Sequence, residues 1–79
     1  MTSVTSHALQ RWGERFGKRS ALRDIREEFT RAEKWKPNRV RRLGVRIDSS
    51  RRYYVTELCI FVVAAQNGAI ITILQRKRT

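Results

Sequence analysis

One histidine and two arginines recur at four-residue intervals near the start of the chain: His7, Arg11 and Arg15. Residues with this spacing share one face of an α-helix. Histidine is the side chain best suited to proton transfer near neutral pH, and the planar guanidinium group of arginine can bind two oxygens of a phosphate. His7 and Arg11 could therefore meet one phosphate. Two alternatives for His7 stay open, a solvated residue in the first helical turn and a metal ligand.

A second group of residues, from Lys36 to Arg52, carries most of the charge. Seven of these seventeen residues are lysine or arginine, Asp48 is the single acidic residue among them, and the 79-residue chain has a net charge of +11. A surface this positive repels itself, and a polyanion relieves that repulsion while displaced counterions add affinity. Nucleic acid is therefore the leading partner, with a merely solvated basic surface and an anionic membrane face as alternatives.

The expected nucleic-acid contacts come from basic side chains and from one tryptophan that lies between two lysines. That tryptophan could stack on a base. The expected contact residues are Arg15, Lys36, Arg39, Arg41, Arg42, Arg46, Arg51, Arg52 and Trp35.

The length of the chain indicates a single domain, residues 1–79, with flexible ends at residues 1–5 and 76–79. The N-terminal residues lack the features of a secretory signal, and the longest apolar stretch, residues 58–65, is too short to cross a bilayer. The single cysteine, Cys59, makes no internal disulfide and is expected to be a small buried hydrophobic residue. We expect a cytoplasmic protein that has no cofactor or metal and does not contact a membrane.

The first half of the chain has helical spacing. Ser6 is expected to cap a helix that begins at His7 and ends at Gly17, with an apolar stripe of Leu9, Trp12 and Phe16. A second helix is expected to start after a cap at Ser20 and to end near Trp35, because Pro37 cannot continue it. Its apolar stripe comprises Leu22, Ile25, Phe29 and Ala32.

The second half of the chain changes to a period of two. Residues 43–47 alternate apolar side chains with arginine and glycine, which predicts a strand with one basic face. Further strands are expected over residues 51–56, 58–65 and 69–75, the last with alternating faces. A turn at Asp48-Ser49-Ser50 and a type I′ hairpin turn at Asn67-Gly68 separate them. The predicted fold class is α+β: two N-terminal helices packed on a three- to four-stranded antiparallel meander sheet, with the other sheet face open.

These features, in this order, resemble the small bacterial and phage domains of the barnase–EndoU–colicin–RelE group of metal-independent ribonucleases. The resemblance spans nearly the whole chain. It implies a helical layer against a four-stranded sheet, and toxin-like RNA cleavage without metal in a cleft on the sheet. It also implies a protein partner, an antitoxin or immunity protein. The matching pieces are Ser6-His7-Ala8-Leu9-x-Arg11-x-x-x-Arg15, Arg52-Tyr53-Tyr54-Val55, Phe61-Val62-Val63, Asn67-Gly68 and Ala69-Ile70-Ile71-Thr72-Ile73-Leu74.

The resemblance extends to three candidate catalytic residues: His7, Arg11 and Thr72. RNA cleavage by attack of the 2′-hydroxyl on the phosphate also needs a second proton-transfer group. Glu57 and Tyr54 are the candidates, with Tyr53 as an alternative to Tyr54, since neighbouring strand residues face opposite ways.

Two functions follow from these observations. The first is an RNA-binding, metal-independent endoribonuclease. The alternative is a non-catalytic phage or bacterial protein that binds nucleic acid or inhibits a host enzyme acting on nucleic acid. In either case an exposed sheet edge could pair with a second copy to form a homodimer.

Overall fold

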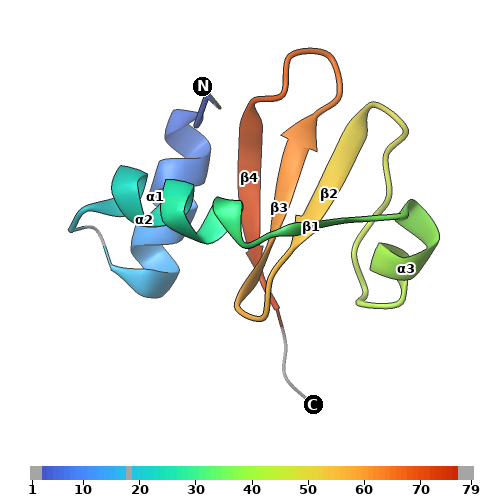
Figure 1. The fold of residues 1–79 in the computed structure, drawn as a ribbon, viewed down its shortest axis with the longest axis horizontal. Coiled ribbons are helices and arrows are strands. Elements are labelled where there is room, and N and C mark those ends of the chain that lie inside the picture. Colours follow the sequence, from blue (N-terminus) through green and yellow to red (C-terminus); the bar gives the residue numbers. More distant parts are fainter. Residues whose placement is uncertain (1–2, 18, 77–79) are drawn as a thin grey trace.

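The structure, a computed structural model, describes residues 3–17 and 19–76. It confirms the α+β class and the antiparallel meander, whose four strands follow the order β1-β2-β3-β4 (Figure 1). The elements, in chain order, are α1 (Ser6–Phe16), α2 (Ala21–Thr30), β1 (Glu33–Trp35), α3 (Pro37–Arg41), β2 (Arg51–Val55), β3 (Cys59–Ala64) and β4 (Ile70–Gln75).

Helix α1 begins one residue earlier than expected. Thr5 is the N-cap, and its side chain accepts a hydrogen bond from the backbone N–H of Ala8 at 3.2 Å, so the expected cap at Ser6 is wrong. The helix ends at Gly17 as predicted, where the N–H of Gly17 donates to the carbonyl of Gly13. Gly17 has a φ of 107° and a ψ of 147°, a positive-φ conformation that favours glycine but is not the left-handed helical one.

Helix α2 is shorter than expected. Ser20 precedes it with a φ of 59° but makes no side-chain capping hydrogen bond. The helix ends at Thr30, and the chain then forms the edge strand β1, where the sequence had predicted helix. Pro37 does not end α2. It starts α3 instead, because the missing N–H of proline costs nothing in the first turn of a helix.

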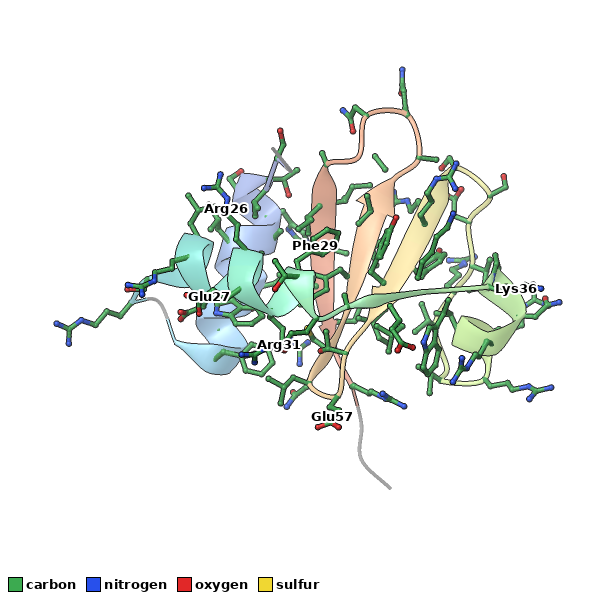
Figure 2. The ribbon with its side chains drawn as sticks, viewed as in Figure 1. Arg26, Glu27, Phe29, Arg31, Lys36 and Glu57 are labelled. Atoms are coloured by element: carbon green, nitrogen blue, oxygen red, sulfur yellow. The ribbon has the colours of Figure 1, made fainter. Side chains whose placement is uncertain are left out.

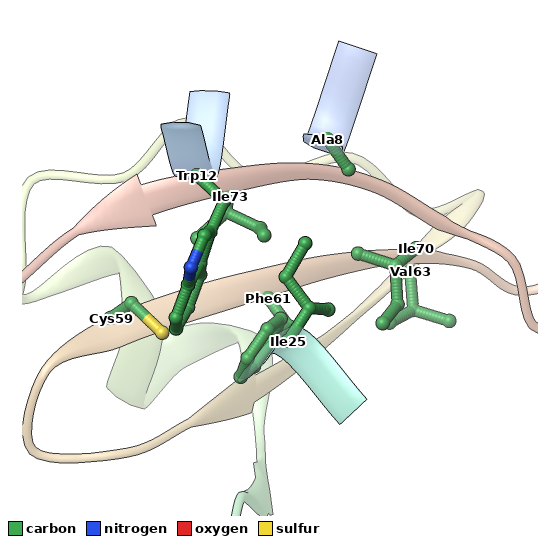
Figure 3. Close-up of a cluster of buried hydrophobic side chains, with 8 residues drawn as sticks. All are labelled: Ala8, Trp12, Ile25, Cys59, Phe61, Val63, Ile70 and Ile73. Carbon is green, nitrogen blue, oxygen red and sulfur yellow. The ribbon is translucent and has the colours of Figure 1, made fainter. Parts of the chain in front are cut away.

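The first face of the sheet is covered by α1 and α2. Trp12 and Ala8 of α1 and Ile25 of α2 are buried against it (Figure 3). Phe29 adds an edge-to-face contact with Phe61, at 5.1 Å between ring centroids. The sheet residues of this first core are Cys59, Phe61, Val63, Ile70 and Ile73. The stripe predicted for the first helix therefore faces the sheet. The stripe predicted for the second helix does so only in part, because Ile25 and Phe29 pack in this core whereas Leu22 is exposed and Ala32 lies beyond the end of α2.

The second face of the sheet is also covered, so the prediction of an open face is wrong. The cover segment, residues 36–50, contains α3 and the loop after it, and no strand forms at residues 43–47. Figure 1 shows α3 on the side of the sheet opposite α1 and α2. The cover segment contributes Val40, Leu43, Val45 and Ile47 to a second core, against Tyr53, Val55, Ile60, Val62, Leu74 and Trp35. Apolar and polar residues do alternate over residues 43–47. The apolar side chains pack on the face of the sheet, and the segment does not become one of its strands.

A buried tyrosine hydroxyl holds the loop of the cover segment. The hydroxyl of Tyr53 accepts a hydrogen bond from the N–H of Asp48 at 3.0 Å and donates to the carbonyl of Arg46 at 3.3 Å. The predicted turn at residues 48–50 is present: the N–H of Arg51 donates to the carbonyl of Asp48, whose carboxylate accepts from the N–H and the hydroxyl of Ser50. The loop is therefore linked to β2 through the hydroxyl of Tyr53 and through the N–H of Arg51.

The β3–β4 hairpin departs from the prediction in two ways. Five residues, 65–69, connect β3 and β4, and of the described non-glycine residues only Ser20 has a positive φ, so the type I′ assignment to Asn67-Gly68 is wrong. A bulge also pairs Val63 with Ile70 but Val62 with Thr72. The extra residue, Ile71, shifts the alternation and puts Ile70 and Ile73 in the same core.

The chain ends are hydrogen-bonded as far as they are described. The N–H of Ile70 donates to the carbonyl of Ser3, and the N–H of Thr5 donates to the carbonyl of Ile70. Near the other end, the backbone N–H of Arg76 donates to the carbonyl of Leu58, and its guanidinium group donates to the carbonyl of Thr56. Residues 1–2 and 77–79 of the predicted flexible ends lie outside the described residues. None of the helices in the described part of the chain has the length and apolar character needed to cross a bilayer.

The fold predicts an unequal effect of removing the two neighbouring tyrosine hydroxyls. Tyr53→Phe should lower the free energy of unfolding by about 1–2 kcal/mol, because it removes two hydrogen bonds that hold the cover segment. Tyr54→Phe is the matched control, since its hydroxyl has no hydrogen bond to any residue that the structure describes. Urea unfolding followed by tryptophan fluorescence measures both, and equal effects would contradict the assignment.

Candidate nucleic-acid interface

The cover segment separates its side chains by type. Its apolar residues lie on the sheet, and its arginines are exposed: Arg39, Arg41, Arg42 and Arg46. With Lys36 at the start of α3 and Arg51 and Arg52 at the start of β2, they form what we call the basic face. Because burial of the apolar residues fixes the segment on the sheet, the arginines are held outward.

Ion pairs distinguish the basic face from the helical side of the molecule. Three of the four ion pairs found among the described residues lie on the helical side, where arginines of α1 and α2, and Arg31 just after α2, contact glutamates at 3.3–3.7 Å. Within the same described part, the basic face has a single pair, Arg51 Nε to Asp48 Oδ2 at 3.9 Å. Hydrogen bonds from the side chain and backbone of Ser50, with a smaller contribution from Arg51, lower the pKa of Asp48. Most of the positive charge of the basic face is therefore available to an external anion.

A groove opens where β1 ends and β2 begins. The antiparallel register pairs Trp35 with Tyr53, which brings Lys36 level with Arg52. The groove has a volume of about 550 Å³, and four cationic side chains line it: Lys34, Lys36, Arg51 and Arg52. Trp35, Pro37, Ser49, Tyr53 and Ala65 complete its lining, and none of these described lining residues is acidic. We call it the basic groove.

Trp35 organises arginines beside the basic groove. The guanidinium carbon of Arg39 lies 3.8 Å from the centroid of the Trp35 ring, and that of Arg76 lies 5.2 Å away, both within the range of cation–π contacts. The ring also packs on the second core. Trp35 thus orients two arginines, and its stacking on a base stays a prediction.

The predicted catalytic residues do not share one cleft. His7 and Arg11 are exposed on α1, and Arg11 contacts Glu14 at 3.5 Å. Thr72 lies on the other side of the sheet, in a hollow lined by residues of the second core and by Arg46, Asp48 and Arg51. The sheet therefore separates Thr72 from His7 and Arg11.

The candidates for a second proton-transfer group lie elsewhere again. Glu57 is exposed at the turn between β2 and β3 (Figure 2), in a hollow that Arg31 and Arg76 also line. Tyr54 packs against Phe29 on the helical face, with 5.1 Å between ring centroids. Arg15, expected to contact nucleic acid, donates instead to the side chain of Gln75 at 3.0 Å on the helical side. This arrangement does not assemble an acid, a base and a phosphate-binding group around one point.

Metal binding and thiol chemistry have little support in the described residues. Among these residues, no group of three or more histidine, cysteine, aspartate or glutamate side chains is arranged to hold a metal ion. Cys59 is fully buried, and its desolvation raises the pKa of the thiol to about 11, although a contact with Thr56 opposes the shift.

Two residues of this region were missed by the sequence reading. Lys34 lines the basic groove, but the sequence had placed it in the second helix, among mixed charges. Arg76 had been placed in a flexible tail, yet it contacts Trp35 and Thr56. An edge strand of only three residues leaves too short a pattern to be recognised, so Lys34 was noted as a neighbour of Trp35 but not placed on a strand.

No protein-family model, curated protein or solved structure matches the chain, so its function is inferred from its own residues and their geometry.

The burial of Cys59 predicts slow thiol chemistry in the folded protein. A pKa raised from 9.0 to about 11 lowers the thiolate fraction about 100-fold at pH 8, so iodoacetamide should label the native protein at least that much more slowly than the urea-unfolded chain. Because the shift is upward, the thiol ionises first in the unfolded chain, and stability should fall as the pH rises from 9.0 to about 11. Mass spectrometry measures the labelling, and equal rates in both states would contradict a buried thiol.

Proposed function

We propose that the protein is a non-catalytic nucleic-acid-binding module that holds the phosphate backbone with its basic face. One observation carries the proposal: seven basic residues gather on and beside the cover segment, with one ion pair among the described residues there. On the helical side, by contrast, Arg11, Arg23 and Arg31 are each paired with a glutamate. Uncompensated charge of this kind gives affinity for polyanions through counterion release.

The residue types of the basic face suit phosphate. Six of its seven members are arginine, whose planar fork can donate two hydrogen bonds to phosphate oxygens. The second core and the hydroxyl of Tyr53 fix the segment that presents most of them. A preformed surface loses less conformational entropy on binding than a mobile tail of the same charge.

The chemistry of the exposed surface favours nucleic acid over a membrane. Membrane-surface binding usually adds large apolar side chains beside the basic ones. The exposed large hydrophobic residues found in the described part of the chain are Leu22, at 41%, and Leu58, at 43%, and neither belongs to the basic face. RNA in the cytoplasm is the proposed ligand. An acidic protein surface is the competing candidate for the partner, and the RNA-binding experiment distinguishes between the two.

Two matched double variants test the proposed interface. Arg41→Gln with Arg42→Gln should weaken binding of a fluorescent RNA oligonucleotide and reduce the slope of log affinity against log salt by about 1 to 1.5, because two phosphate contacts are lost. Arg23→Gln with Arg26→Gln makes the same charge change on α2 and should leave the slope within about 0.5 of the wild type. Fluorescence anisotropy at several salt concentrations gives both slopes. Equal slopes for the two variants, or no RNA binding by the wild type, would reject the interface.

The separation of the predicted catalytic residues gives a second expectation. Structured and unstructured RNA incubated with the protein in EDTA should stay intact, because no proton-transfer pair among the described residues flanks a common phosphate site. His7→Ala should bind RNA as tightly as the wild type. The proposal would be wrong if cyclic-phosphate ends appeared with the wild-type protein and disappeared with His7→Ala, since that result is the signature of a ribonuclease using His7.

A further inference from the structure

We infer that the basic groove is a binding site for a phosphomonoester, the terminal phosphate of a nucleic-acid strand. The inference rests on the proposed function and goes further, because it assigns a chemical group to one subsite. It begins from the four basic residues that line the groove: Lys34 and Lys36 at the end of β1, and Arg51 and Arg52 at the start of β2. Elsewhere on the basic face the arginines lie along an exposed surface, whereas here four cations share one hollow.

The charge of the groove suits a dianion better than a monoanion. A backbone phosphodiester carries one negative charge, whereas a phosphomonoester carries about −1.5 to −2 near pH 7 and has three strong acceptor oxygens. The basic residues around the hollow can donate charge-assisted hydrogen bonds to three terminal oxygens of a phosphomonoester, but to only two non-bridging oxygens of a diester. The additional attraction is therefore specific to the end of a strand.

The acidic residue that pairs with Arg51 is already engaged. The carboxylate of Asp48 pairs with Arg51 at 3.9 Å, but it also accepts two short hydrogen bonds from Ser50, at 2.8 and 2.6 Å. These bonds hold the carboxylate on its own turn, and Asp48 is not among the residues that line the groove. Arg51 can therefore turn a donor toward a bound phosphate without leaving Asp48 unpartnered.

The size of the groove suits a single nucleotide unit. Its volume of about 550 Å³ lies within the usual range of small-ligand pockets, roughly 300–1,000 Å³. Its other walls are partly apolar, from Trp35, Pro37, Tyr53 and Ala65, and can contact a sugar or a base edge. A hollow of this size can hold the terminal nucleotide of a strand.

The test compares single-stranded RNA oligonucleotides of one sequence that end in a phosphate or a hydroxyl, at the 5′ end and separately at the 3′ end. By anisotropy, the wild type should bind one phosphorylated form about tenfold more tightly, the effect of one or two additional charge-assisted hydrogen bonds. Lys36→Gln with Arg52→Gln, both exposed and unpaired with any described carboxylate, should remove this preference. Arg41→Gln with Arg42→Gln is the control and should weaken both forms equally while keeping the preference.

Competition with adenosine monophosphate tests whether the groove binds a free nucleotide or the end of a strand. Displacement of RNA by millimolar adenosine monophosphate, lost in the Lys36→Gln, Arg52→Gln variant, would support the site. The same displacement together with equal affinity for all RNA ends would identify a free nucleotide, rather than a strand end, as its ligand. Equal affinity for all RNA ends together with no displacement would overturn the inference, while salt-dependent RNA binding would leave the proposed function standing. Absence of any RNA binding would reject the proposed function and, with it, the strand end as the ligand of the groove.

Discussion

The packing of the cover segment on the second face of the sheet is the contact on which both the second core and the basic face depend. Strands β2 and β3 present Tyr53, Val55, Ile60 and Val62 on that face, and this apolar surface must be removed from water. Val40 of α3 and three residues of the following loop cover it. Once they are buried, the intervening arginines can only point outward, so one packing event both completes the core and creates the basic face.

The same packing explains the uneven distribution of charge. Acidic residues are concentrated on the helical side, where they pair with arginines, and Asp48 is the single acidic residue of the segment from Lys36 to Arg52. Without a ligand, the like charges of the basic face oppose folding of the segment that carries them. A bound polyanion would relieve this repulsion, so polyanion binding and the stability of the cover segment are thermodynamically coupled.

The sequence predicted the parts of the fold that have long, regular patterns. The stripes of α1 and α2, the three later strands and the hairpin position were evident from periodicity. The cover segment was mistaken for a strand because alternation puts Leu43, Val45 and Ile47 on one side in either arrangement. The bulge at Ile71 and the three-residue strand β1 left no local signal, since pairing across the sheet defines both. Most of the basic residues singled out from the sequence lie on or beside the cover segment, but their arrangement around a groove required the register of β1 and β2.

The central claim is that the basic face on the cover segment meets the ligand, and an NMR titration tests it most directly. Amide resonances of ¹⁵N-labelled protein would be followed as an unlabelled single-stranded RNA is added at low salt. The account predicts that shifts concentrate in residues 34–52 and that α1 is unaffected. Shifts concentrated around His7, Arg11 and Arg15, with residues 34–52 unchanged, would contradict it.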